Sequence, residues 1–130
     1  MVPRFVFRLP VRWSLLCAIT LMTVSISGGV NAGAQKAASE IMAGKAIYQQ
    51  HCAKCHGLAG WGDGPEAAKL RVSPRNFHDA ITDLKPDEHL RMSVAYGVMT
   101  TPMHAWRGTL SDQEIDEVVS YIRLLSNRAR

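Results

Sequence analysis

The sequence lacks the alternation of apolar and polar residues that is typical of β-strands, and it contains no internal repeat. It also lacks the residue sets of common hydrolytic sites: there is no H-E-x-x-H, no convincing catalytic triad and no carboxylate pair. Its Gly-rich segment has no Gly-Lys-Ser/Thr ending, which excludes a phosphate-binding loop. These absences argue against a β fold and against acid–base or nucleophilic catalysis, and 130 residues allow one domain at most.

Clustered basic residues are also absent. The formal charge is +4, but Arg4, Arg8 and Arg12 precede residue 35 and all 11 acidic residues follow it. From residue 35 onward, twelve basic and eleven acidic residues remain, a balance of +1. Because a nucleic-acid-binding domain needs Lys and Arg gathered on one face, we expect no nucleic-acid partner.

Residues 1–34 have the three parts of a secretory signal peptide: an Arg-rich start, an apolar stretch over 14–26, and small residues ending in Ala32-Gly33-Ala34. The apolar stretch is shorter than the roughly 20 residues of a membrane-spanning helix, and Ser and Thr interrupt it. We expect cleavage after Ala34, which leaves 35–130 as a soluble domain that is periplasmic or otherwise exported. Cleavage after Ala32 and retention of the segment as a membrane anchor are the alternatives.

Cysteine is scarce: after residue 34 only Cys52 and Cys55 remain, followed directly by His56. In an exported protein such a pair must be oxidised, metal-bound or consumed. C-x-x-C-H is typical of covalent haem attachment, because each sulfur can add to one vinyl group and the His can bind the iron from the proximal side. The pattern predicts one haem c with its iron. Zinc is the alternative, although adjacent Cys and His ligands fit the usual zinc spacing poorly.

Helical signals account for most of the remaining chain. We expect helices over 39–50, over 65–70 and from Pro86 to the residue before Gly97. The strongest begins at Ser111, where Glu114 completes a capping box. Its apolar stripe consists of Ile115, Val118, Val119, Ile122 and Leu125. The predicted fold class is all-α.

A haem iron bound by His56 has a sixth coordination position. The candidates for it are Met99, Met103, His78, His89 and His104. Met103 follows Pro102, which restricts the backbone and favours a stiff approach to the far face of the macrocycle. A thioether is soft, favours Fe(II) and blocks the position that O2 or peroxide would need. The residues favour Met103, with Met99, a His ligand or an open site as alternatives.

Taken together, these features resemble a class I c-type cytochrome over roughly residues 39–125. The matching residues are Gly44, Tyr48, Cys52-x-x-Cys55-His56-Gly57, Gly60 to Pro65, Pro74-Arg75-Asn76-Phe77, Gly97, Thr101 to Trp106, and Leu110 to Arg123. The resemblance implies a small helical domain wrapped around one haem, with His56 and Met103 as axial ligands. It also implies that the N- and C-terminal helices cross closely beside Gly44.

The resemblance also implies further haem-binding residues. The Pro65 carbonyl would accept the Nδ1 proton of His56, a contact that orients a ligand imidazole. Arg75 would pair with a haem propionate, unless it is an ordinary solvated cation, and Trp106 would pack near the propionate edge. His104 departs from many relatives, which have Pro directly after the ligand Met, and this keeps His/His ligation open.

The predicted function is one-electron transfer, by an exported carrier or by an electron-entry subunit that associates with a membrane respiratory complex. Its partners would be redox proteins acting as donor and acceptor, and we expect no small-molecule substrate. The alternative is a haem enzyme, or a gas- or peroxide-binding protein, with an open or displaceable sixth iron site.

Overall fold

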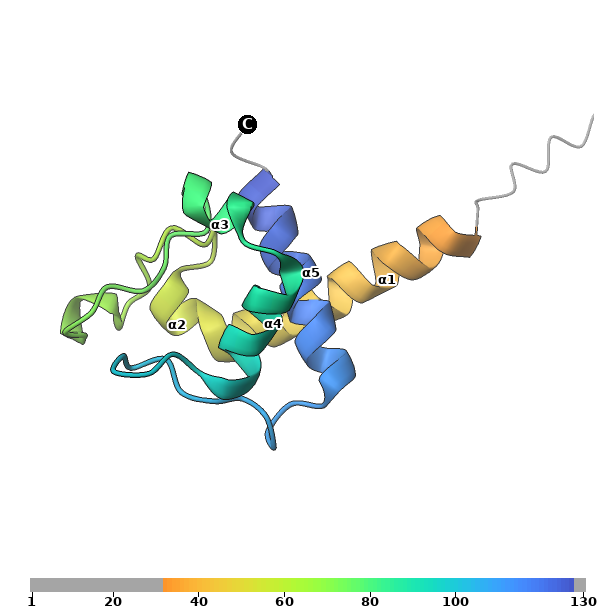
Figure 1. The fold of residues 1–130 in the computed structure, drawn as a ribbon. Coiled ribbons are helices and arrows are strands. Elements are labelled where there is room, and N and C mark those ends of the chain that lie inside the picture. Colours follow the sequence, from red (N-terminus) through yellow and green to blue (C-terminus); the bar gives the residue numbers. More distant parts are fainter. Residues whose placement is uncertain (1–31, 128–130) are drawn as a thin grey trace, which may run out of the picture.

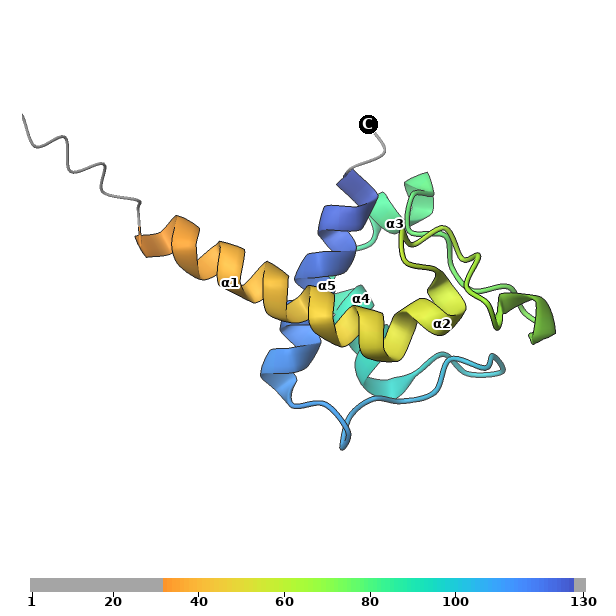
Figure 2. The ribbon, with the colours of Figure 1, turned by 180° about the vertical axis from the view of Figure 1, so that it is seen from behind.

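The computed structural model describes residues 32–127, so the predicted signal peptide lies almost wholly outside the described residues. The elements are α1 (Ala32–Ile47), η1 (Tyr48–Cys52), α2 (Ala53–His56), η2 (Ala67–Lys69), α3 (Ala80–Leu84), α4 (Asp87–Tyr96) and α5 (Asp112–Asn127). Residues 32–127 contain no named β-strand, and the all-α prediction is confirmed. In Figures 1 and 2 the first part of α1 projects from the domain, while its second part crosses α5.

The crossing of α1 and α5 depends on Gly44. A Cβ at this position would lie 1.9 Å from the backbone oxygen of Glu117, so only a residue without a side chain allows this approach. One turn later, the buried ring of Tyr48 packs against Tyr121 with 5.3 Å between ring centroids. The close crossing that the resemblance implied is confirmed.

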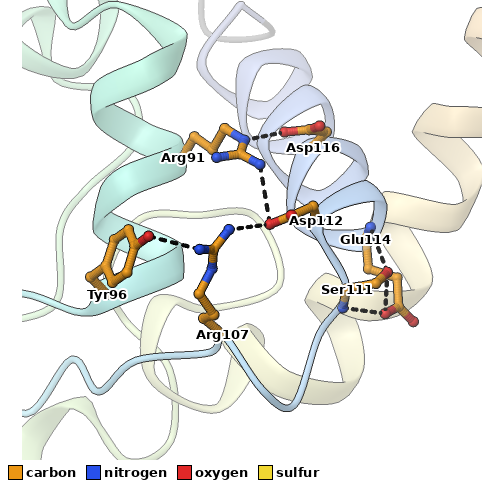
Figure 3. A network of polar contacts seen from close by, with 7 residues as sticks. All are labelled: Arg91, Tyr96, Arg107, Ser111, Asp112, Glu114 and Asp116. Carbon is orange, nitrogen blue, oxygen red and sulfur yellow. Dashed lines mark hydrogen bonds and ion pairs between the residues drawn. The ribbon is translucent and has the colours of Figure 1, made fainter.

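Helix α5 supplies more of the buried core than any other element. Its five predicted stripe residues are all buried, from Ile115 to Leu125. At its start the Ser111 amide donates to the Glu114 carboxylate at 2.8 Å, and the Glu114 amide donates to Ser111 Oγ at 3.3 Å (Figure 3). The capping box is confirmed, and it satisfies amide groups that the first helical turn leaves without partners.

The C-x-x-C-H segment continues the first helix. The sequence predicted a helix that stops before Cys52, but α1 passes into the wider π-helical turn η1 and then into α2 without a break. Such wide turns are frequent at functional sites, because they change the angular register of the residues that follow. Here Tyr48 is buried in the core, while Cys52 lies only partly buried at its edge.

Helix α3 was not predicted. It has five residues, too few to show an apolar period in the sequence. Arg123 of α5 holds it in place by donating to the Thr82 carbonyl at 2.8 Å and to the Asp87 carboxylate at 2.6 Å. Arg123 therefore connects α5 to the α3–α4 region.

Candidate haem site

A cavity of about 500 Å³ lies among α2, the 70–79 segment, α4 and the loop between α4 and α5. This volume is within the range of small-molecule and cofactor sites. We call it the central cavity. Its wall includes Cys52, Cys55, His56, Phe77, Leu90, Val94, Met103 and Trp106.

The two thiols of the attachment motif are both on this wall and are not bonded to each other. Burial, followed by the proximity of Cys55, raises the pKa of Cys52 to about 12. A thiol with such a pKa stays protonated at neutral pH, which is unlike a redox-sensing cysteine, where a lowered pKa provides the thiolate. Two unbonded thiols beside an imidazole on a wall with many apolar residues fit a covalently attached haem.

The His56 ring is held from two sides. Its Nδ1 lies 3.1 Å from the backbone oxygen of Arg75, to which it donates, and its face stacks on Phe77 with 4.8 Å between centroids and 14° between planes. Burial lowers the pKa of His56, although the bond to the Arg75 carbonyl opposes this effect. A neutral ring that donates from Nδ1 keeps the Nε2 lone pair for a metal.

The acceptor for His56 differs from the sequence prediction. Pro65 was expected to supply the carbonyl, but in the structure the Arg75 carbonyl takes this place, and Pro65 does not line the central cavity. The reason is the path of the 74–77 segment, which passes beside α2 and brings both Arg75 and Phe77 to the imidazole. A contact between Pro65 and haem stays a prediction.

Met103 lies on a loop that is closed by its own hydrogen bonds. The Val98 amide donates to the Met103 carbonyl at 2.9 Å, and the Met103 amide donates to Thr101 Oγ1 at 3.2 Å. Gly97 begins the loop with a φ of 74°, a conformation that favours glycine. Met103 is half-buried and lines the central cavity, whereas Met99 is 89% exposed and is not on its wall.

The three histidine candidates for the sixth position are separated by the fold. His104 lines the central cavity beside Met103. His78 does not: its ring stacks on Trp61 at 3.8 Å, and its Nε2 lies 2.8 Å from the Ala59 carbonyl. His89 is exposed on α4 and is also absent from the wall. Of the five candidates, Met103 and His104 remain at the cavity.

The remaining predicted residues, Arg75 and Trp106, both line the central cavity. The Arg75 guanidinium is about half exposed and lies 3.9 Å from the Asp79 carboxylate. Trp106 is buried, with the rings of His51 at 5.0 Å and His104 at 4.5 Å. His51 was not among the predicted site residues, although its position directly before Cys52 could have indicated it. The propionate contacts stay predictions.

One hydrogen bond ties the core to the end of the attachment motif. The buried Tyr48 hydroxyl donates to the Gly57 carbonyl at 2.7 Å, directly after His56, and burial raises the pKa of this phenol.

We expect Tyr48→Phe to lower the free energy of unfolding by about 1–2 kcal/mol, because the Gly57 carbonyl loses its buried donor. Urea denaturation measures this. Tyr121→Phe is the control, since within the described residues no hydrogen bond of its hydroxyl is found, and an equal loss in both variants would contradict the assignment.

Within 32–127 no three or more His, Cys, Asp or Glu side chains are grouped so that they could hold a metal ion. Across the same range, none of the helices combines the length and apolarity needed to cross a bilayer.

Comparison with known proteins agrees with the site. Residues 39–122 match the family model described as cytochrome c oxidase, cbb3-type, subunit III. The chain is 29% identical over 99 residues to dihydro-heme d1 dehydrogenase of Pseudomonas aeruginosa. The matched stretch covers 76% of this chain but only 18% of that relative.

Two solved structures are also similar to this chain. The Kuenenia stuttgartiensis reducing HAO-like protein complex Kustc0457/Kustc0458 contains a chain with 31% identity and a TM-score of 0.61, over 67% of this chain and 44% of that one. The KustC0563 c-type cytochrome has 26% identity and a TM-score of 0.53, over 63% of this chain and 95% of that one. The chain belongs to the family of the cbb3-type cytochrome c oxidase subunit III domain, and is a class I c-type cytochrome that carries covalently bound haem c.

Proposed function

We propose that this chain transfers single electrons, with His56 and Met103 as the axial ligands of its haem iron. The observation that carries the proposal is that both side chains line the same cavity, one from α2 and the other from a hydrogen-bonded loop. When bound, the haem supplies a reversible Fe(II)/Fe(III) couple.

The protein's own residues would support this role in distinct ways. Cys52 and Cys55 anchor the cofactor, and the Arg75 carbonyl holds the Nδ1 proton of His56 and so orients the ring. Met103 adds a neutral, soft ligand, which favours the reduced iron. The apolar residues of the wall, Phe77, Leu90, Val94 and Ile122, exclude water from the site.

The comparisons favour a redox protein as the partner. The matching relatives are named as a dehydrogenase and as part of a protein complex, and this chain spans 18% and 44% of their respective lengths. A domain of this size would pass electrons to or from such a larger assembly, as a free carrier or as an electron-entry subunit of a respiratory complex. We also propose that residues 1–34 direct export and are removed, so that the domain works in the periplasm.

His104 favours a second candidate function. It lines the cavity directly after Met103, so its imidazole could compete with Met103 for the iron and make the sixth ligand exchangeable. A protein with an exchangeable sixth ligand could bind gases or peroxide at the iron instead of transferring electrons only.

One preparation tests both candidates. The protein is produced in cells with haem-attachment machinery and its mass is measured under denaturing conditions, where one covalent haem should remain. The same measurement on a Cys52→Ala, Cys55→Ala variant should show none. The reduced wild-type protein should have a low-spin c-type spectrum that added CO leaves unchanged. Rapid CO binding would instead support the exchangeable site and contradict His/Met electron transfer.

Fractionation of the native cells distinguishes a free carrier from a subunit of a membrane complex. A free carrier should be recovered in the soluble periplasmic fraction, whereas a subunit should stay with a membrane complex through purification. Recovery of a chain that retains residues 1–34 would contradict the proposed cleavage.

A further inference from the structure

The loop that carries Met103 returns to the end of α4 immediately afterwards. The Trp106 amide donates to the Val94 carbonyl at 3.1 Å, and the Arg107 amide donates to the Ala95 carbonyl at 3.0 Å. These bonds satisfy carbonyls at the C-terminus of α4, which have no partner within the helix. The loop is thus closed at its start by Gly97 and at its end by Trp106 and Arg107.

The Arg107 side chain joins the loop to both neighbouring helices (Figure 3). It donates to the Tyr96 hydroxyl of α4 at 2.8 Å and to the Asp112 carboxylate of α5 at 2.5 Å. Its guanidinium also lies 5.1 Å from the centroid of the Tyr96 ring. The bond to Arg107 is the main reason that the pKa of Asp112 is lowered.

A second arginine uses the same carboxylate, and its hydrogen bond and ion pairs within the described residues all go to α5. Arg91 of α4 lies 3.2 Å from Asp112 and 2.7 Å from Asp116, both on α5 (Figure 3). Arg91 therefore joins two helices, whereas Arg107 joins these helices to the segment that bears Met103. This difference provides a matched pair of residues within one network.

We propose that Arg107 is a positioning residue: it holds the Met103 loop against α4 and α5, and thereby sets how readily an external ligand replaces Met103 at the iron. The proposal rests on the proposed ligation by Met103. An external ligand can bind only to molecules in which Met103 has left the iron, so its apparent affinity rises in proportion to the population of the open loop.

The experiment compares Arg107→Gln with Arg91→Gln as oxidised, haem-loaded proteins titrated with imidazole. The guanidinium of Arg107 is about half exposed, so we expect a moderate rise in imidazole affinity of about three- to fivefold in Arg107→Gln. Arg91→Gln should stay within about 1.5-fold of the wild type, although it loses two ion pairs while Arg107→Gln loses one, and both should unfold at lower temperature. Equal affinities in the two variants would overturn the proposal.

A second pair keeps the test independent of how well Arg107→Gln folds. Tyr96→Phe removes the hydroxyl that accepts from Arg107, and Asp116→Asn removes a partner of Arg91 alone. Tyr96→Phe should raise imidazole affinity by about twofold, and Asp116→Asn should leave it unchanged. The reverse order, or no difference, would also overturn the proposal.

Failure of iron ligation by Met103 gives a different result from failure of the Arg107 positioning role. If Met103 is not the sixth ligand, Met103→Ala leaves the wild-type imidazole affinity unchanged, and the proposed function fails whatever the arginine variants do. If Met103→Ala raises the affinity but Arg107→Gln matches Arg91→Gln, the ligation stands and only the positioning role fails.

Discussion

Met103→Ala should convert a protein that ignores CO into one that binds it. If Met103 occupies the iron in all but about 1% of molecules, its removal should raise the apparent CO affinity of the reduced protein by about a hundredfold. The midpoint potential should fall as well, because the thioether favours Fe(II) over Fe(III). Optical titration with CO and redox potentiometry measure the two effects.

Two neighbouring variants provide the controls. Met99 is 89% exposed and lies outside the cavity wall, so Met99→Ala should leave both CO binding and potential unchanged. His104 lines the wall, so His104→Ala distinguishes the two ligand candidates. CO binding in His104→Ala but not in Met103→Ala would show that His104 is the sixth ligand and that the Met103 assignment is wrong.

Gly44→Val should cause the largest loss of stability. The added Cβ would lie 1.9 Å from the Glu117 oxygen and 2.5 Å from its carbonyl carbon. These are backbone atoms of α5, which cannot rotate away as a side chain would, so α1 and α5 must separate. We expect the free energy of unfolding to fall by about 3 kcal/mol or more. Urea denaturation of the haem-loaded protein measures it.

Ala46→Val is the matched control for Gly44→Val. It introduces the same β-branched side chain two residues away, at an exposed position of α1. The cost there should be limited to the weak helix propensity of valine, about 0.5 kcal/mol. Similar losses in both variants would mean that the crossing of α1 and α5 tolerates a side chain at Gly44.

Several features of this protein could be predicted because they depend on neighbours in the sequence. The attachment motif has its thiols and imidazole within five consecutive residues, Cys52 to His56. The capping box of α5 joins Ser111 to Glu114, and the apolar stripe repeats with the helical period. Such short-range patterns are set by backbone geometry, whatever the rest of the chain does.

The ligand sphere could be predicted only in part. Five residues were candidates for the sixth position, and neither composition nor spacing shows which of them reaches the cavity. The stacking of His78 on Trp61 and the exposure of Met99 and His89 arise from how separate loops pack. The Arg75 carbonyl took the place predicted for Pro65 because the 74–77 segment folds back onto the imidazole, although Arg75 lies 19 residues beyond His56 in the sequence.

By itself, the sequence determined the helical class and the covalent haem site, since each has a local signature, whereas the helix crossing at Gly44 was implied by the family resemblance and confirmed by the structure. Only the tertiary structure decided that Met103 and His104 share a wall with His56, that His51 packs on Trp106, and that Arg91 and Arg107 share Asp112. These contacts join residues from different helices and loops. They depend on the crossing angle of helices and on the path of loops, which are fixed only when the whole core packs.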